Sequence, residues 1–179
     1  MKLFKSHIPF AKATSIYEIP ADFYNKNNVK TLFVDLDNTL DSYKSRIPND
    51  KVIKLINAIK ATGVNVVILS NNKEKRVGAY ARLVPCDYIF STGKPFPKKI
   101  NKYLKENNLN SEDVMLVGDQ MITDVGVANH AKIRVILTDK IVKEDQWTTH
   151  INRLIGSLIR HYHNKHNNFI NWREYYGES

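Results

Sequence analysis

Two aspartates, Asp35 and Asp37, lie two residues apart directly after the largely apolar run 29–34. Close together and away from water, two carboxylates repel each other unless a cation lies between them. Carboxylate oxygens, water and a phosphate oxygen are ligands that suit Mg²⁺. One carboxylate can then attack phosphorus, and the other can protonate the leaving oxygen and later deprotonate a water. The pair predicts a metal-assisted phosphoryl-transfer site, with an acidic turn as the alternative.

Two groups that suit a bound phosphate follow the next two apolar runs, 64–69 and 87–90. Ser70 and Asn71 follow the first run, where a hydroxyl beside exposed backbone N–H groups can cradle phosphate oxygens. Lys94 follows the second run and can neutralise the phosphoryl oxygens together with the nucleophile. Alone, Ser70 and Asn71 would be ordinary turn residues and Lys94 a surface charge. Their order after the acid pair predicts that all three bind the phosphoryl group.

A second acidic group follows the apolar run 114–117. Asp119 comes directly after Gly118, where the missing side chain lets the backbone approach closely. Asp124 follows five residues later. We predict that Asp119 is a further metal ligand and that Asp124 supports the metal directly or through water.

The helices and strands that must position these groups alternate along the chain. Short β-branched runs predict buried strands, and apolar residues at helical spacing predict helices. Strands separated by single helices form right-handed crossovers, which produce a parallel sheet covered by helices on both faces. The carboxyl ends of such strands meet at one crevice, so the four groups should lie together. Strands are expected at 29–34, 64–69, 87–90, 114–117 and 134–137, with helices between 49 and 63, at 73–83 and at 97–107.

The composition predicts one soluble domain. The chain has 179 residues, 42% of them hydrophobic, which is enough for one core but not for two full domains. The net charge of +9 favours anionic partners such as phosphorylated substrates, nucleic acid or an acidic membrane face. No apolar run approaches the roughly 20 residues that cross a bilayer. We expect a cytoplasmic protein, with peripheral contact to the inner face of the membrane as a further option.

The single cysteine, Cys86, excludes an internal disulfide and a multi-cysteine zinc site. No basic or histidine-rich context surrounds it in the sequence, so we expect a buried, unreactive thiol.

The two ends of the chain differ from the middle. Residues 1–28 are expected as an N-terminal extension, 29–145 as the core, and 146–179 as a C-terminal helix with a basic aromatic tail packed on or beside that core. The basic run 160–166 contains three histidines that do not share one helical face, so it predicts a solvated surface rather than a metal site. The aromatic tail predicts packing or a partner contact. The apolar stripe expected to dock the helix consists of Ile151, Leu154, Ile155, Leu158 and Ile159.

The four groups together resemble the four motifs of the haloacid dehalogenase (HAD) superfamily of phosphatases. The pattern is Asp-x-Asp-x-Thr at 35–39, Ser-Asn at 70–71, Lys-Pro at 94–95 and Gly-Asp-Gln-x-x-Thr-Asp at 118–124, and the resemblance spans residues 29 to about 137. The finer pattern is similar to a small capless bacterial group called YqeG-type, related to phosphatidylglycerophosphate phosphatases. It also includes Asn72, Arg76-Val77 and the stretch 149–153, whereas 126–132 departs from the more glycine-rich segment usual there.

The resemblance implies a three-layer α/β/α sandwich with a Rossmann-like parallel sheet in the order 5-4-1-2-3. It implies that Asp35 is the nucleophile and a metal ligand. Asp37 would be the acid/base and would give its backbone carbonyl to Mg²⁺. Ser70 and Lys94 would hold the phosphoryl group. Asp119 would complete the metal site, and Asp124 would stand behind it.

Many members of the superfamily cover the site with an inserted cap domain. Here the stretch 41–48 is short, and 70–94 leaves room for one helix and one strand, so no cap is expected. An open crevice favours a large or membrane-presented phosphate ester, with phosphatidylglycerophosphate as one candidate. Lys44, Arg46 and Lys73 border the crevice and could bind such a group, or be ordinary solvated charges.

Two other classes of protein use a related fold. A receiver domain also combines acidic residues, Mg²⁺ and an aspartyl-phosphate, but its phosphorylated aspartate would follow the third strand, where this chain has Ser91-Thr92-Gly93. A non-catalytic RNA- or ribosome-associated module is suggested by the charge and the basic tail. Retention of every motif residue argues against that reading, and steep salt dependence of RNA binding without turnover would favour it.

Overall fold

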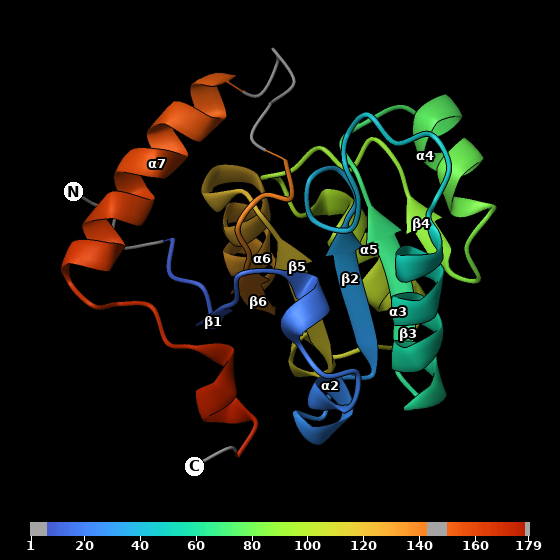
Figure 1. The fold of residues 1–179 in the computed structure, drawn as a ribbon, viewed down its shortest axis with the longest axis horizontal. Coiled ribbons are helices and arrows are strands. Elements are labelled where there is room, and N and C mark those ends of the chain that lie inside the picture. Colours follow the sequence, from blue (N-terminus) through green and yellow to red (C-terminus); the bar gives the residue numbers. More distant parts are fainter. Residues whose placement is uncertain (1–6, 143–149, 178–179) are drawn as a thin grey trace.

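A sheet of six parallel strands forms the centre of the protein, in a computed structural model that describes residues 7–142 and 150–177 (Figure 1). The strand order is β1-β6-β5-β2-β3-β4, so the predicted order of five strands is confirmed and β1 adds a sixth at one edge. The strands are β1 (Ala11–Lys12), β2 (Thr31–Asp35), β3 (Asn65–Leu69), β4 (Asp87–Ile89), β5 (Val114–Gly118) and β6 (Arg134–Leu137).

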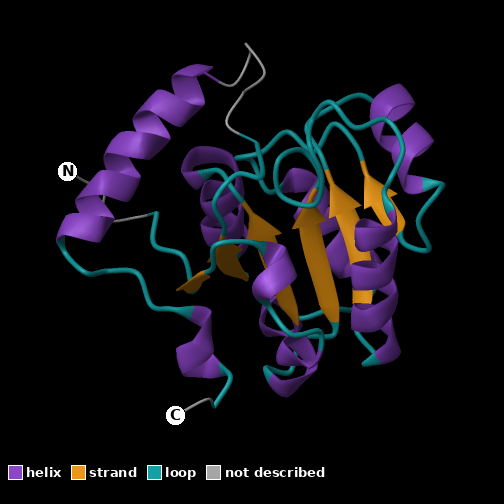
Figure 2. Cartoon of the chain, in the orientation of Figure 1, coloured by secondary structure: helices purple, strands orange, loops and turns teal. Residues whose placement is uncertain are grey.

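Helices cover both faces of the sheet, which confirms the three-layer α/β/α prediction (Figure 2). Side chains of α3 (Asp50–Ala61) and α4 (Glu74–Ala81) pack in the core on one face, and those of α5 (Lys98–Glu106) and α6 (Gly126–Ala131) in the core on the other. The predicted strands and helices of this part begin and end within two residues of those observed. The remaining elements are η1 (Ile16–Glu18), α2 (Asp22–Lys26), η2 (Ser111–Asp113), η3 (Met121–Val125), α7 (His150–Lys165) and η5 (Trp172–Tyr175).

Strand β2 lies in the middle of the sheet, between β3 and β5. All five of its residues are buried, which is why its sequence reads as a continuous apolar run up to Asp35. Asp35 pairs in register with Leu69, the last residue of β3. The carboxyl ends of the neighbouring strands therefore lie level with each other, and the groups that follow them meet at one edge of the sheet.

The start and end of α3 follow from local chemistry. The Asn49 side-chain oxygen accepts hydrogen bonds from the backbone N–H groups of Lys51 (3.0 Å) and Val52 (3.2 Å). These bonds satisfy donors that the first turn of a helix leaves unpaired. Gly63 follows the last turn with a φ of +89°, a left-handed conformation that glycine adopts without steric cost.

The segment before residue 29, expected as an extension, takes part in the sheet and the core. Strand β1 pairs in parallel with β6, and Ile16, Phe23 and Tyr24 are fully buried. A two-residue edge strand carries too weak a pattern to be recognised from sequence. The tail covers this edge, because the Lys12 N–H donates to the Ile170 carbonyl at 2.8 Å. Covering an edge strand blocks pairing with other chains.

The aromatic tail packs on the N-terminal segment rather than reaching toward the strand ends. Trp172 is buried and meets the Phe23 ring edge-on at 5.8 Å, and the Tyr175 ring stacks on Phe10 at 4.1 Å. The Tyr176 hydroxyl donates to Asp22 at 2.7 Å. The tail therefore has the packing role expected of it.

Helix α7 docks through a different face from the one predicted. Ile159 is fully buried, but Leu154 is 67% exposed and Leu158 57%, so the predicted apolar stripe is wrong for these two residues and for the exposed Ile155. Contact is made beside Gly156, where an added Cβ would meet Met121 at 3.4 Å. A small residue at this position lets the helix lie close to η3, and apolar spacing does not predict which face of the helix makes this contact. The side chain of Ile151 and residue Thr149 lie outside what is described.

The basic run 160–166 is only partly a solvated surface. His161 and His166 are exposed, but His163 is fully buried. The Arg160 side chain points toward the protein body, where its guanidinium donates to the carbonyls of Asp119 (3.0 Å) and Thr138 (3.1 Å). The prediction is therefore wrong for Arg160 and His163.

Neither place where a cap could be inserted holds one. Residues 42–49 form turns and bends, and the stretch from Ser70 to Lys94 contains α4 and β4. Both stretches lie entirely within the described chain, so the expectation of a capless fold is confirmed. Among the described helices, none is both long and apolar enough to span a membrane.

Candidate active site

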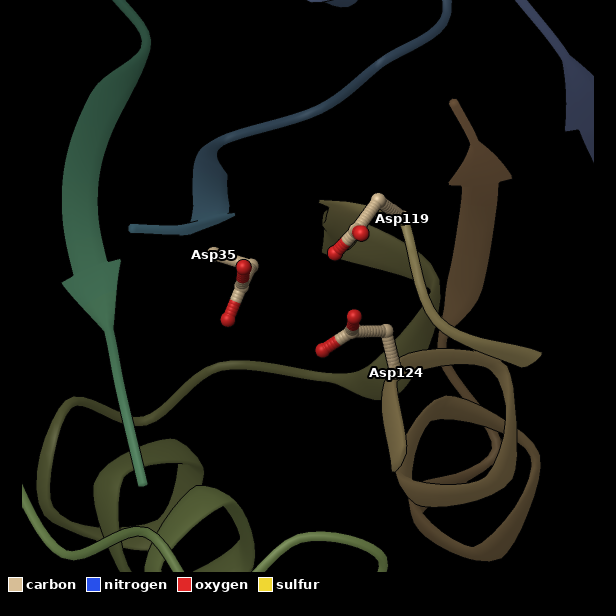
Figure 3. A group of neighbouring side chains, drawn as sticks. All are labelled: Asp35, Asp119 and Asp124. Atoms are coloured by element: carbon tan, nitrogen blue, oxygen red, sulfur yellow. The ribbon is translucent and has the colours of Figure 1, made fainter. Parts of the chain in front are cut away.

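Three predicted acidic residues converge at the carboxyl edge of the sheet. Asp35 ends β2, Asp119 follows β5, and Asp124 lies in η3 (Figure 3). One carboxylate oxygen from each lies within 4.8 Å of the other two, and all three residues are buried. Figure 3 shows the Asp119 and Asp124 carboxylates turned toward the side of the site that holds Asp35. Carboxylates gathered in this way form a set of hard oxygen ligands.

Lys94 joins this acidic group from the loop after β4. Its Nζ donates to Asp35 Oδ1 at 2.5 Å and to Asp124 Oδ1 at 2.6 Å, and its side chain is 3% exposed. The second Asp124 oxygen accepts the backbone N–H of Gln120 at 3.0 Å. The second Asp35 oxygen, Oδ2, is buried and accepts no hydrogen bond from the described residues. A buried oxygen of this kind needs a further partner.

The donor set fits a divalent cation. Asp35, Asp119 and Asp124, when ionised, carry three negative charges, and Lys94 supplies one positive charge among them. The remaining excess matches the charge of Mg²⁺, and oxygen ligands are those that Mg²⁺ prefers. The unpartnered Asp35 Oδ2 offers a ligand atom.

The pKa values of Asp35 and Lys94 are both shifted by these surroundings. Burial raises the pKa of Asp35 well above its usual range, the Lys94 charge lowers it, and the charges of Asp124, Asp119 and Asp37 raise it. For Lys94, burial lowers the pKa, but the charges and hydrogen bonds of Asp124 and Asp35 together outweigh burial and raise the pKa above its ordinary range. The shift of the Lys94 pKa thus reflects the negative charge around it, whereas the shift of the Asp35 pKa reflects chiefly its burial.

Asp37 lies beside this group, held by a separate set of donors. Its Oδ2 accepts from Ser70 Oγ at 3.1 Å and from Asn72 Nδ2 at 2.8 Å, and its Oδ1 accepts from Arg76 Nη2 at 3.1 Å. The Asp37 side chain is 16% exposed, more than that of Asp35 at 8%. The two aspartates of the first motif thus lie in different surroundings, one buried against a lysine and the other at the rim.

Asn71 holds the loop that carries Lys94. Its Oδ1 accepts from the Thr92 hydroxyl at 2.6 Å and from the Lys94 N–H at 2.9 Å, and its Nδ2 donates to the Lys94 carbonyl at 3.2 Å. Binding of substrate by Asn71 stays a prediction, because its side-chain amide is engaged in positioning Lys94. The hydroxyl of Ser70 lies between Asp37 and the Asn72 N–H, to which it is bonded at 3.1 Å.

The comparisons with known proteins agree with this geometry. A family model described as "HAD-hyrolase-like" matches residues 91–154. Over 155 residues the chain is 30% identical to the "Probable phosphatase YqeG" of Bacillus subtilis (strain 168), covering 87% of this chain and 90% of that protein. The chain belongs to the YqeG-type phosphatases of the HAD superfamily.

The fold of this HAD phosphatase is also similar to a solved structure. It matches a hypothetical protein from Xanthomonas campestris with a TM-score of 0.50 and 13% sequence identity, covering 69% of this chain and 71% of that chain. Identity at this level shows a shared fold alone.

Four residues contact the HAD motif residues without having been singled out as site residues. Thr39 and Asn72 lie inside the motifs, and the Thr39 hydroxyl donates to Asp119 at 3.3 Å. Arg76 lies in the first turn of α4, four residues after Asn72, and its place directly behind the second motif was the available signal. Arg160, 41 positions further along the chain, donates to the Asp119 carbonyl, and no motif near Arg160 predicts this contact.

Gly118 is required by the close approach of Asp124. A Cβ built on Gly118 would lie 2.5 Å from the Asp124 Cβ and 2.6 Å from its Oδ2. Gly118→Ala must therefore displace this carboxylate, and we expect the affinity for Mg²⁺ to fall by about 10- to 100-fold. Titration calorimetry with Mg²⁺ measures this loss. Gly156→Ala, whose Cβ would meet Met121 at an ordinary 3.4 Å, is the control, and unchanged affinity in Gly118→Ala would contradict the assignment.

Cys86 takes no part in the site. Its thiol is partly buried at the turn before β4, and burial raises its pKa to about 12, with the Lys60 charge opposing the shift. A thiol with so high a pKa is a poor nucleophile at neutral pH. The expectation of an unreactive cysteine is consistent with these surroundings.

Proposed function

We propose that this HAD phosphatase hydrolyses phosphomonoesters with Mg²⁺, through a phosphoryl group carried transiently on Asp35. The observation that carries the proposal is the buried Asp35 carboxylate, bonded to Lys94 at 2.5 Å through one oxygen and unpartnered through the other. A buried carboxylate with a fixed cation beside it can attack phosphorus with one oxygen while its other oxygen stays bound to a cation.

In the first step, an Asp35 oxygen attacks phosphorus and the bond from phosphorus to the ester oxygen breaks. Asp37 donates its proton to that leaving oxygen, so the alcohol departs neutral. Its bonds to Ser70, Asn72 and Arg76 hold the carboxyl group in place for this transfer. Lys94 and Ser70 would hold the phosphoryl oxygens while the charge redistributes.

In the second step, water attacks phosphorus in the aspartyl-phosphate and Asp37 takes up its proton. The acyl-phosphate bond breaks, inorganic phosphate leaves, and Asp35 is restored as a carboxylate. Asp35, Asp119 and the backbone carbonyl of Asp37 would hold Mg²⁺, with Asp124 supporting them. The ion, when bound, neutralises charge on the phosphoryl group and on the carboxylates around it.

The capless site supports a large or membrane-presented substrate, of which phosphatidylglycerophosphate is one. Two large apolar side chains, Ile47 and Phe96, are 71% and 72% exposed on loops that follow β2 and β4. Lys44 and Arg46 precede Ile47 on the first loop. Exposed apolar residues beside basic ones suit an anionic lipid surface. We accordingly propose that the protein acts in the cytoplasm, in peripheral contact with the inner face of the membrane.

The test is release of inorganic phosphate from a panel of soluble phosphomonoesters and of lipid phosphates in vesicles. We expect turnover that requires Mg²⁺, is lost with EDTA and returns when Mg²⁺ is restored. Higher kcat/KM for vesicle-borne substrates would support the membrane-presented class, and a clear preference for soluble ones would contradict it. Absence of phosphate release from every substrate would overturn the proposed activity.

A further inference from the structure

A basic cavity lies next to the acidic site, on the side of Asp37. It has a volume of about 420 Å³ and is lined by Tyr43, Lys44, Arg46, Asn72 and Arg76. Three of these five side chains are cationic, and none is a carboxylate. A concave surface lined by one sign of charge concentrates ions of the opposite sign.

Two of the lining residues also hold the acid/base carboxylate. Asn72 donates to Asp37 Oδ2 at 2.8 Å, and Arg76 donates to Asp37 Oδ1 at 3.1 Å. The cavity and Asp37 therefore share a wall. Because Asp37 protonates the leaving oxygen in the proposed reaction, the leaving group must depart past this carboxylate, so the cavity lies where the leaving group would extend.

Arg76 has hydrogen-bonding capacity that the described residues do not use. Its Nη2 donates to Asp37 and, at 3.4 Å, to the Tyr43 carbonyl, but its Nη1 is buried without a hydrogen-bond partner. The side chain is 12% exposed. A guanidinium carries several donors in a fixed plane and matches phosphate oxygens well. A guanidinium with an unused donor, on a side chain that lines a basic cavity, suits an anionic ligand.

Two further cations come from the turn after the first motif. Lys44 and Arg46 are exposed, and Arg46 has no ion-pair partner within the described ranges. The turn is anchored, because Asp41 accepts hydrogen bonds from Ser45 (2.8 Å) and from the buried Tyr80 hydroxyl (2.8 Å). Lys44 and Arg46 are thus presented on a held turn at the rim of the cavity.

We propose that this cavity binds a second phosphate group, carried by the alcohol that leaves during hydrolysis. The proposal rests on the proposed function and narrows its substrate to phosphomonoesters with another phosphate a few atoms beyond the scissile bond. Arg76 would bind that group from within the cavity, and Lys44 and Arg46 from its rim. The same chemistry is found in a soluble bisphosphate and in a phospholipid headgroup that ends in a phosphomonoester.

A matched pair of substrates tests the proposal. Glycerol 1-phosphate and glycerol 1,3-bisphosphate differ by one phosphate, and we expect the wild-type protein to have a higher kcat/KM for the bisphosphate. In Lys44→Ala/Arg46→Ala, the ratio of the two kcat/KM values should fall by about tenfold or more, since charge-assisted hydrogen bonds to the second phosphate are lost. Lys102→Ala/Lys105→Ala removes the same charge from exposed positions on α5 and should leave the ratio unchanged.

A binding measurement separates this proposal from the activity. Asp35→Asn, tested with glycerol 1,3-bisphosphate by titration calorimetry, should bind about tenfold more weakly when Lys44 and Arg46 are also replaced by alanine. If the wild-type protein releases phosphate but the ratio survives in Lys44→Ala/Arg46→Ala, the cavity assignment is overturned and the phosphatase stands. If no substrate is hydrolysed, the proposed activity is contradicted. The calorimetry then tests by itself whether the cavity binds a phosphate.

A third arm identifies the source of the second phosphate. Phosphatidylglycerophosphate in phosphatidylcholine vesicles carries the same glycerol bisphosphate unit, attached to a lipid. Loss of efficiency in Lys44→Ala/Arg46→Ala with both the vesicles and the soluble bisphosphate supports a phosphate subsite that serves either source. Loss of efficiency with the vesicles but not with the soluble bisphosphate would instead assign Lys44 and Arg46 to membrane contact and contradict the proposal.

Discussion

Asp35→Asn is expected to reduce phosphate release by about 10⁴-fold or more, because the attacking oxygen is lost. Asparagine has nearly the same shape and retains one oxygen, so the fold should persist. At a pH above the raised pKa of Asp35, the substitution also removes a buried negative charge from a site with excess negative charge. Without added metal, we expect its free energy of unfolding to rise by about 1 kcal/mol, as is common when a charged functional residue is neutralised.

The pH dependence of stability provides a second readout of Asp35. Its pKa is raised in the folded state, so the metal-free native protein keeps a proton that the unfolded chain releases. Stability from this group is therefore fully present below the usual aspartate range and is lost as the pH rises through the raised value. Asp35→Asn should remove this loss. Urea unfolding with EDTA, measured at pH 5 and pH 8, compares the two proteins.

The control for this prediction is Asp87→Asn, an isosteric change at an exposed position where β4 begins. It should retain activity and the wild-type dependence of stability on pH. Full activity in Asp35→Asn would show that the covalent mechanism is wrong. Lost activity with an unchanged pH dependence of stability would mean that the pKa shift of Asp35 does not cause this pH dependence.

Lys94→Met is expected to have the second-largest effect. The Lys94 ammonium is the cation bonded to both Asp35 (2.5 Å) and Asp124 (2.6 Å) in a buried site. Its removal leaves two buried carboxylates without their partner, which should lower the free energy of unfolding by about 3 kcal/mol in metal-free protein at pH 8. Loss of a cation that holds the phosphoryl group should also reduce phosphate release by about 10³-fold.

Metal and a matched lysine separate these two effects. Saturating Mg²⁺ should restore part of the stability of Lys94→Met, because a ligand that binds the folded state stabilises it, while activity should stay low. The control Lys99→Met removes a lysine that donates to the Phe90 carbonyl at 2.6 Å rather than to carboxylates. It should retain most activity. Wild-type stability and turnover in Lys94→Met would contradict the placement of Lys94 in the site.

Most of the fold was predictable because its signals are local. Strand β2 is a run of buried residues ending in Asp35, and α3 begins at an asparagine that caps it. The docking of α7 was not predictable, since Leu154 and Leu158 repeat at helical spacing yet are exposed. The helix contacts η3 beside Gly156, so the contact face depends on where a small residue permits close approach rather than on apolar period.

The sequence by itself determined the identity and order of the predicted site residues, because each ends or follows a strand and parallel strands end at one edge. These residues are Asp35, Asp37, Ser70, Lys94, Asp119 and Asp124. The tertiary structure decided how these residues are partnered. The contacts of Asp37 with Arg76 and of Asp119 with Arg160 join residues 39 and 41 positions apart, respectively. Such contacts depend on how α4 and α7 pack against the sheet, which propensity and spacing do not encode. For Asp35 and Asp37, the sequence identified the pair, and packing placed Asp35 against Lys94 and Asp37 beside a basic cavity.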